Sequence, residues 1–406
     1  LIQEVAKLKQ LKANYCGDPY SFEEILEQSP LIELIFLDLN MPNRDGIEIL
    51  RVLAEKQFHG EIILMSGFDA SVLATAQHLA QEYGLNLQAP ITKPFGAKKL
   101  MALLSTHNFG QPKPTRDEDF PTPYNQPIQS NKYTSEQILT WLTDGRIVIH
   151  YQPQIELKYN RVIGVESLVR LLDDENNIVY PSAFIPTIEE NQSTKILLEK
   201  VLERICMDYE VYHDHLQHLK FSVNVSALDL NQLTFPDELY QRFALSRLPI
   251  SNITVEVTES QAIEQIKTGL DILVRLRLKG FSLSIDDFGT GRAVLGNVRQ
   301  MPYNELKIDR SFINQLITDD KTNLITKDLI RMAQNLNLTL VAEGIENVET
   351  ANCLRAMGCH VAQGYYFAKP MPIDQLVHWI DNFESHHSNQ DTLDYENSNS
   401  KEKDCA

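Results

Sequence analysis

The stretch "FSLSIDDFGTG", residues 281 to 291, is an alternating segment that runs into two adjacent carboxylates. Its apolar side chains alternate with Ser282, Ser284 and Asp286, and a second acid, Asp287, follows at once. Alternation with a period of two is typical of a β-strand with one apolar and one polar face. We therefore predict a strand whose carboxyl end carries two acids directly before a glycine-containing turn.

The same alternation recurs through the second half of the chain. It is found in "VIGVESLVR" (162–170), "FSVNVS" (221–226), "ITVEVTES" (253–260), "ELKID" (305–309) and "TLVAE" (339–343). Stretches with helical three-to-four spacing, such as 193–212 and 321–337, lie between these segments. Alternating strands and helices predict parallel strands with right-handed crossovers. An open α/β sheet, the alternative to a closed barrel, would have strands that are apolar on both faces.

Composition limits the classes of function. The chain has 406 residues, 43% of them hydrophobic, and a formal net charge of -18. The charge argues against a general nucleic-acid binder, which needs Lys and Arg against the phosphate backbone. The five cysteines lack zinc-site spacing and read as reduced thiols. Reduced thiols predict a cytoplasmic protein, and the net charge predicts no DNA partner. Because no apolar run reaches the roughly 20 residues of a membrane helix, we also predict no membrane partner.

Shifts in composition divide the chain into four parts. Residues 107–134 are rich in Pro, Asn, Gln and charge, which is typical of a linker. The tail at 384–406 is polar and acidic, and we predict that it is disordered. The segment 135–383 has about the 250 residues of a (β/α)8 TIM-like barrel. Residues 1–106 would form a smaller domain in front of the linker.

The polar faces of the predicted strands end in oxygen donors. These inward-facing residues are Glu166, Asn224, Glu256, Asp286, Asp287, Lys307, Glu343 and Gln363. Carboxylate and amide oxygens favour Mg2+ or Mn2+ over zinc, and two such ions can activate water and clamp a phosphoryl group. Any one of these acids, taken alone, could instead be a solvated strand end or a helix N-cap.

The successive motifs of 135–383 resemble one enzyme family. The segments "GVESLVR", "PSAFIPTIEE", "FSVNVS", "VEVTES", "SIDDFGTG", "LKIDRSF", "LVAEGIE" and "AQGYYFAKPMP" look like those of the EAL family of cyclic di-GMP phosphodiesterases. The resemblance implies a barrel enzyme that hydrolyses one phosphodiester bond of cyclic di-GMP to give linear pGpG, with two divalent cations. A kinase-like use of the "DFG" triplet is excluded, since no Gly-rich loop, VAIK lysine or HRD loop accompanies it.

The resemblance assigns roles to individual residues. It implies metal ligands at Glu166, Asn224, Glu256, Asp286 and Asp287. It implies that Lys307 and Glu343 orient or deprotonate the attacking water and that Glu259 steadies the loop after the double Asp. Substrate and water contacts are implied for Gln152, Leu168, Arg170, Gln363 and Glu346. Asp309 shares the inward face of its strand and could instead only brace Lys307.

Two positions depart from the family pattern. Ser167 stands where the signature has Ala, and it lies on the opposite face from Glu166. The loop after the double Asp reads Arg292-Ala293-Val294 in place of a hydroxyl-bearing turn. Since that loop couples the metal site to a dimer interface in the family, we predict a homodimer whose coupling differs from that of its relatives.

The front domain resembles response-regulator receivers, which are flavodoxin-like, doubly wound domains. An apolar strand ends in Asp38, a second ends in Ser66, and Lys93 precedes a proline. The resemblance implies that Asp38 is the phosphoacceptor, that the Ser66 hydroxyl senses the phosphoryl group and that Lys93 is its ion-pair partner. A sensor histidine kinase would be the phosphate donor. The first strand and its acidic Mg2+ pair are missing from the sequence, so a plain flavodoxin-like unit without phosphorylation is the alternative.

Three functions are compatible with these motifs. The first is a receiver-regulated phosphodiesterase, and the second is a sensor that binds cyclic di-GMP without hydrolysing it. The third is a protein-interaction scaffold with no nucleotide role. Because every position that the family motifs single out holds the expected residue type, we expect the enzyme.

Overall fold

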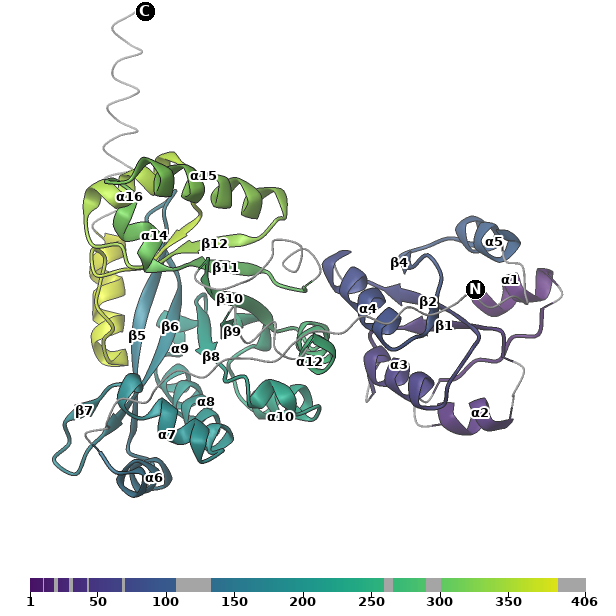
Figure 1. Cartoon of the computed structure of the whole chain (residues 1–406), viewed down its shortest axis with the longest axis horizontal. Coiled ribbons are helices and arrows are strands. Elements are labelled where there is room, and N and C mark those ends of the chain that lie inside the picture. The colour runs from purple at the N-terminus through teal and green to yellow at the C-terminus, as the bar shows by residue number, and fades with distance from the viewer. Residues whose placement is uncertain are drawn as a thin grey trace, which may run out of the picture. The chain divides into compact units, whose positions relative to one another are not determined.

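The computed structural model describes two compact units of the chain (Figure 1). Unit 1 comprises Leu1–Ile128, Gly269–Leu278 and Arg299–Pro302, and unit 2 comprises the remainder. The described residues are 1–9, 11–17, 21–28, 32–41, 44–67, 70–106, 133–258, 266–289 and 301–385. Most of the predicted linker (107–132) and most of the predicted tail (386–406) lie outside them.

Unit 1 contains a parallel sheet between helices. Its elements are α1 (Ile2–Leu8), α2 (Phe22–Gln28), β1 (Leu34–Asp38), α3 (Gly46–Glu55), β2 (Glu61–Ser66), α4 (Ala70–Glu82), β3 (Asn86–Leu87), β4 (Ile91–Thr92) and α5 (Ala97–Thr106). Strand β2 lies between β1 on one side and β3 and β4 on the other, and all pairs are parallel. The predicted receiver-like α/β fold is confirmed.

Both faces of this sheet are covered, as a doubly wound fold requires. Along β2, Ile62 and Leu64 pack into a core cluster with α3 and α4. The alternate side chains, Ile63 and Met65, pack into a second cluster with α1 and α5. Successive residues of a strand point to opposite faces, so a continuous apolar run such as "IILM" is what a sheet buried on both sides requires.

A segment from later in the chain belongs to unit 1. It is the Gly269–Leu278 part of helix α12 (Ile266–Leu278). Its Arg275 is buried and donates a hydrogen bond to Asp45, at 2.9 Å. Asp45 also caps α3, accepting hydrogen bonds from two backbone N–H groups at 3.1 Å. The buried guanidinium is thus paired, as a charge removed from water requires.

Unit 2 is built around a second, larger sheet. Its strands are β5 (Ile147–Glu156), β6 (Arg161–Leu172), β7 (Ile178–Val179), β8 (Lys220–Asn224), β9 (Ile253–Thr258), β10 (Ser282–Phe288), β11 (Glu305–Ile308), β12 (Thr339–Ala342) and β13 (Val361–Ala362). Its helices are α6 (Ser135–Thr143), α7 (Ile185–Glu190), α8 (Thr194–Val211), α9 (His213–Leu216), α10 (Phe235–Ala244), α14 (Arg310–Gln315), α15 (Asp320–Asn335), α16 (Val348–Ala356) and a last helix over 373–385.

The larger sheet closes on itself. The nine strands pair in the order β5-β13-β12-β11-β10-β9-β8-β6-β7, and β5 also pairs with β6. Because β7 lies beyond β6, the closed ring contains the other eight strands. The predicted (β/α)8 barrel is confirmed, and the open-sheet alternative is excluded.

One strand of the ring runs against the others. β5 is antiparallel to both of its neighbours, β6 and β13, whereas the strand and helix pattern predicted parallel strands for the alternating segments from 162–170 onward. Only residues 157–160 join β5 to β6, and so short a connection can form only a hairpin. The parallel prediction is confirmed for the segments from which it was made, and β5 was not among them.

Helix α8 is tied to the barrel by a buried polar contact. Tyr151 of β5 donates a hydrogen bond from its hydroxyl to Asp208 of α8, at 2.8 Å. Arg204, one helical turn earlier, also contacts Asp208, at 3.1 Å. Burial raises the pKa of Asp208 and that of Tyr151.

None of the helices within the described ranges combines the length and the apolar character that a membrane crossing requires.

Candidate active site

The predicted site residues come from strands all around the ring. Gln152 lies on β5, Glu166 on β6, Asn224 on β8, Glu256 on β9, Asp286 and Asp287 on β10 and Lys307 on β11, while Glu343 and Gln363 directly follow β12 and β13. The carboxyl ends of barrel strands meet at one mouth, where barrel enzymes hold their sites. Hydrogen bonds and ion pairs join most of these side chains.

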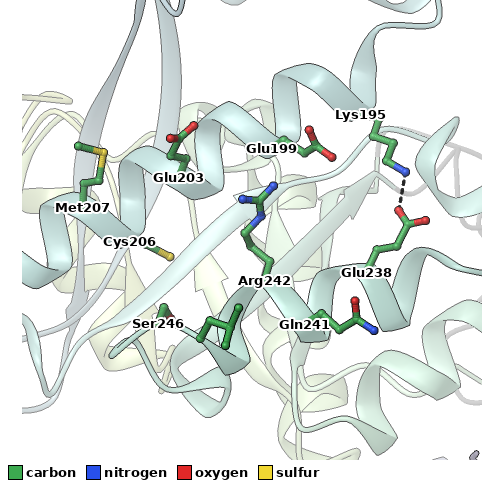
Figure 2. A pocket seen from close by; sticks show the side chains of 10 residues that line it. Lys195, Glu199, Glu203, Cys206, Met207, Glu238, Gln241, Arg242 and Ser246 are labelled. Atoms are coloured by element: carbon green, nitrogen blue, oxygen red, sulfur yellow. Dashed lines mark ion pairs between the residues drawn. The ribbon is translucent and has the colours of Figure 1, made fainter.

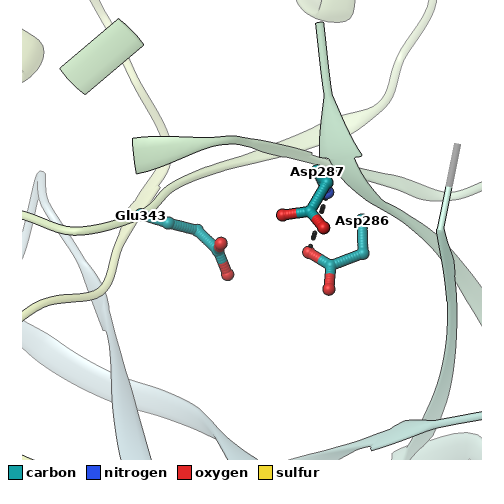
Figure 3. A group of neighbouring side chains, drawn as sticks. All are labelled: Asp286, Asp287 and Glu343. Carbon is teal, nitrogen blue, oxygen red and sulfur yellow. Dashed lines mark hydrogen bonds between the residues drawn. The ribbon is translucent and has the colours of Figure 1, made fainter. Parts of the chain in front are cut away.

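The two adjacent acids both face this mouth because the backbone breaks its alternation between them. The pairing of β10 with β11 shifts its register between Ile285 and Phe288, as at a β-bulge. Asp287 has a φ of 54° and Gly289 a φ of 101°, and a bulge of this kind re-aims a side chain. Asp287, which alternation alone would direct outward, therefore joins Asp286 (Figure 3).

Lys307 is the cation at the centre of the site. Its Nζ lies 2.7 Å from Glu343, 3.1 Å from Glu256, 3.2 Å from Asp286 and 3.5 Å from Glu166. Its side chain is 0% exposed. Burial opposes its charge, but the four carboxylates raise the pKa of Lys307 well above its ordinary value. One ammonium thus faces four carboxylates, which leaves an excess of negative charge in a buried site.

Amide side chains hold Glu166 in place. Asn224 donates to one carboxylate oxygen of Glu166 at 3.3 Å, and Gln363 donates to the other. Gln363 also donates to Gln152 at 3.1 Å, and Gln152 donates to the backbone of Ala368 at 3.1 Å. Although burial alone would raise it, Lys307, Gln363 and Asn224 together lower the pKa of Glu166.

For three other acids of the site, burial and the neighbouring carboxylates outweigh the effect of Lys307 on the pKa. Burial raises the pKa of Glu256 well above its ordinary value, and the neighbouring carboxylates raise it further. Burial, with the charges of Glu166 and Asp286, raises the pKa of Glu343 to about 8. Burial and the adjacent Asp286 raise the pKa of Asp287. Repulsion among buried carboxylates is relieved when a cation binds between them.

The donors of this site fit a hard divalent cation. Carboxylate oxygens of Asp286, Asp287 and Glu343 lie within 4.8 Å of one another (Figure 3). The Oε1 atom of Glu256 is buried without a hydrogen-bond partner among the described residues. Oxygen donors with excess negative charge are what Mg2+ and Mn2+ take in proteins. The sequence prediction of a divalent-metal site at this mouth is consistent with the geometry.

Comparisons with known proteins decide the family. Residues 135–370 match the model described as EAL domain, and residues 1–105 match the response regulator receiver domain. This chain is an EAL-family protein.

Several relatives carry names and structures. Cyclic di-GMP phosphodiesterase RocR of Pseudomonas aeruginosa is 28% identical over 349 residues, which are 86% of this chain and 86% of RocR. The bifunctional diguanylate cyclase/cyclic di-GMP phosphodiesterase MucR of the same organism is 34% identical over 57% of this chain but only 34% of MucR. A solved structure, "PaMucR Phosphodiesterase, c-di-GMP complex", matches 59% of this chain and 98% of its own with a TM-score of 0.57 and 33% identity.

Arg170 lies farther along β6, the strand that carries Glu166. It donates to the backbone of Val169 at 2.8 Å, and its Nε is buried without a hydrogen-bond partner within the described part of the chain. Burial lowers its pKa. Its guanidinium lies 5.2 Å from the ring centre of Tyr180, a residue that the sequence reasoning missed because it follows the short strand β7. A partly free guanidinium fits an anionic ligand. Leu168, on the same strand, is half-buried.

Two predicted residues, Asp309 and Glu346, fall outside this cluster. Asp309 caps helix α14 by accepting a hydrogen bond from the N–H of Ser311 at 2.9 Å. Its carboxylate is not among the four that contact Lys307, so the bracing alternative was wrong. Glu346 is exposed on the segment after β12. Glu259 and residues 292–294, where the sequence departs from the family pattern, lie outside the described residues.

The three predicted residues of the receiver domain, Asp38, Ser66 and Lys93, lie at or just after the carboxyl ends of its strands. Lys93 forms an ion pair with Asp38 at the end of β1. The backbone N–H of Lys93 donates to the carbonyl of Ser66, at the end of β2, at 2.8 Å. Within the described ranges, the only group of three or more potential metal-ligating side chains lies in the EAL barrel, so no such group surrounds Asp38.

A separate groove lies between helices α8 and α10 of the EAL domain. Its volume is about 600 Å3, and an ion pair of 2.7 Å between Lys195 and Glu238 crosses it (Figure 2). Arg242, Cys206 and Leu245 also line it. None of the predicted site residues lines this groove, so the predicted chemistry belongs to the barrel mouth.

Proposed function

We propose that this EAL protein is a divalent-metal-dependent phosphodiesterase that hydrolyses cyclic di-GMP to linear pGpG. The observation that carries the proposal is the buried Lys307 ammonium in contact with four carboxylates at the barrel mouth. The names of the relatives support the substrate. A site that only bound the nucleotide would not need this complete set of acids and lysine.

The metal ligands are proposed from the positions of the acids. Glu166, Asn224, Glu256, Asp286 and Asp287 would hold two ions, Mg2+ or Mn2+. Such ions, when bound, lower the pKa of water and neutralise charge on the phosphoryl oxygens. The raised pKa values of Glu256 and Asp287, which burial and the neighbouring carboxylates cause, support this assignment, because a bound cation would relieve both effects.

The chain's own residues orient the reaction. Glu343 contacts Lys307 at 2.7 Å. Glu343 would accept a proton from the attacking water, and Lys307 would orient that water. Attack at phosphorus breaks one P–O3′ bond, so the product is a linear dinucleotide with a 5′-phosphate and a free 3′-hydroxyl. Arg170 would bind a phosphate, because a guanidinium offers two parallel donors. Gln152, Leu168, Gln363 and Glu346 complete the proposed substrate and water contacts.

We further propose that the receiver regulates the barrel. Asp38 would accept a phosphoryl group from a sensor histidine kinase, Ser66 would contact it, and Lys93 would pair with it. The existing contact between Lys93 and Asp38 supports these roles. A homodimer, with Glu259 steadying the loop that couples the two sites, stays a prediction.

One assay tests the catalytic proposal. The purified chain is incubated with cyclic di-GMP and Mg2+ or Mn2+, and pGpG is quantified by chromatography. Glu166→Ala and Lys307→Ala should each abolish product while the circular dichroism spectrum persists. Ser167→Ala, next to Glu166 but on the opposite face of β6, is the matched control and should retain activity.

The alternatives predict different results. Binding of cyclic di-GMP without formation of pGpG would indicate a sensor and not an enzyme. Absence of binding would indicate a protein-interaction scaffold. A fully active Glu166→Ala protein would contradict the metal assignment.

A further inference from the structure

Three polar side chains form a row across neighbouring strands inside the barrel. Ser284 of β10 is in register with Glu256 of β9 on one side and with Glu305 of β11 on the other. In-register residues of adjacent strands share a face, and the contact of Glu256 with Lys307 identifies this face as the interior. We call these three residues the 256–284–305 row.

The row is buried and incompletely hydrogen-bonded. Glu256 and Ser284 are 0% exposed and Glu305 is 7% exposed. Glu256 Oε1, Ser284 Oγ and Glu305 Oε1 each lack a hydrogen-bond partner among the described residues. Burial raises the pKa of Glu305, against the opposing effects of Lys307 and the Ser284 hydroxyl. Three orphaned polar atoms in one row are costly unless they satisfy one another.

Glu305 has no part in the proposed mechanism. It precedes Lys307 by two residues and therefore points into the same interior. However, the four carboxylates within 4.0 Å of the Lys307 ammonium belong to other residues. Direct neutralisation of Lys307 therefore does not account for a buried acid at this position.

Hydrogen-bond accounting gives the row an order. A serine hydroxyl has one hydrogen to donate, so Ser284 can satisfy only one of the two carboxyl groups beside it. The row is complete when Glu305 carries a proton, donates to Ser284 Oγ, and Ser284 donates in turn to Glu256. Acids that bind metals are commonly oriented by such hydrogen bonds from behind.

We propose that Ser284 and Glu305 are positioning residues that orient Glu256 for the metal. This inference rests on the proposed function, because Glu256 is a metal ligand only there. The side chain at 305 must supply a hydrogen-bond donor, and its charge is not required. An amide at this position can replace the carboxylic acid, whereas an apolar side chain cannot.

Manganese affinity without nucleotide tests the proposal. Full-length wild type, Glu305→Gln, Glu305→Met and Ser284→Ala are titrated with Mn2+, and binding is measured by isothermal titration calorimetry. We expect Glu305→Met and Ser284→Ala to bind Mn2+ roughly 10-fold to 100-fold more weakly, the usual effect of removing an outer hydrogen-bond partner. Glu305→Gln should bind like wild type. Ser167→Ala, which also removes a buried hydroxyl that has no hydrogen-bond partner in the described part of the chain, is the matched control and should be unaffected.

Thermal melting of the metal-free proteins separates positioning from general damage. An apolar side chain replaces an incompletely paired buried acid in Glu305→Met, so its melting temperature should stay level or rise while its Mn2+ affinity falls. Unchanged Mn2+ affinity in both Glu305→Met and Ser284→Ala overturns the positioning role and leaves the proposed function intact. Equal losses in Glu305→Gln and Glu305→Met also overturn it. Absence of Mn2+ binding in wild type overturns the proposed metal site and this inference with it.

Discussion

Replacement of Glu343 by glutamine should stabilise the metal-free protein increasingly as the pH rises. The pKa of Glu343 is raised from 4.5 to about 8, chiefly by burial, so the folded chain keeps a proton that the unfolded chain releases. A group whose pKa is raised by folding in this way lowers stability above its unfolded pKa. The loss begins near pH 4.5 and is complete above pH 8. Glutamine does not titrate, so the Glu343→Gln protein does not lose this stability as the pH rises.

The size of the effect follows from proton linkage. A difference of one bound proton changes the free energy of unfolding by about 1.4 kcal/mol per pH unit. Between pH 5 and pH 7, the advantage of Glu343→Gln over wild type should therefore grow by up to about 3 kcal/mol. The hydrogen bond to Lys307 survives the substitution through the amide oxygen, so the contact itself is retained.

Tryptophan fluorescence reports the unfolding of unit 2, the unit that contains Glu343. The chain has two tryptophans, Trp141 and Trp379, and both lie in unit 2. Urea unfolding in the presence of EDTA is followed at pH 5, 6, 7 and 8 for wild type, Glu343→Gln and Glu349→Gln. Glu349 is exposed on α16, and its replacement should leave the pH dependence as in wild type. Parallel pH curves for wild type and Glu343→Gln would refute the reasoning.

Three further outcomes are expected. Arg170→Lys keeps the charge but loses the paired donors of the guanidinium, so KM for cyclic di-GMP should rise roughly 10-fold in steady-state assays; an unchanged KM contradicts a phosphate contact. Substitution of Ca2+ for Mg2+ should inhibit pGpG formation, because Ca2+ is larger and tolerates looser geometry; stimulation contradicts the proposed site. Tyr151→Phe removes the 2.8 Å hydrogen bond to the buried Asp208 and should lower the free energy of unfolding by about 1 to 2 kcal/mol, measured by tryptophan fluorescence; equal stability would show that Arg204 suffices.

Much of the barrel follows from local patterns in the sequence. Alternation identified the strands, and the rule that barrel strands present functional groups at their carboxyl ends placed Glu256, Lys307 and Glu343 at one mouth. The structure brings Glu256 and Glu343 into contact with Lys307. Such placement is predictable because parity along a strand is a local property, and the ring of strands then brings together residues that are far apart in the chain.

Features that depend on the pairing of distant strands were harder to predict from the sequence. The direction of β5 is set by the short connection at 157–160 and by its pairing with β13 on the other side. Alternation is the same in parallel and antiparallel strands, so the pattern carried no directional information. Tyr180 was missed for a similar reason: β7 is only two residues long and has no periodicity to read.

The double Asp of β10 shows why local parity is insufficient where the chemistry is placed. Two adjacent residues of a regular strand point to opposite faces, so Asp286 and Asp287 can share a cavity only if the backbone departs from that geometry. The bulge and the φ of 54° at Asp287 provide the departure. Aspartate tolerates the left-handed region better than β-branched residues do, and Gly289 follows at a φ of 101°. The residue types at the end of the strand thus permit the turn that brings both acids to the barrel mouth, where Asp286 contacts Lys307 and Asp287 lies near Asp286 and Glu343. An irregular backbone is here part of the proposed metal site.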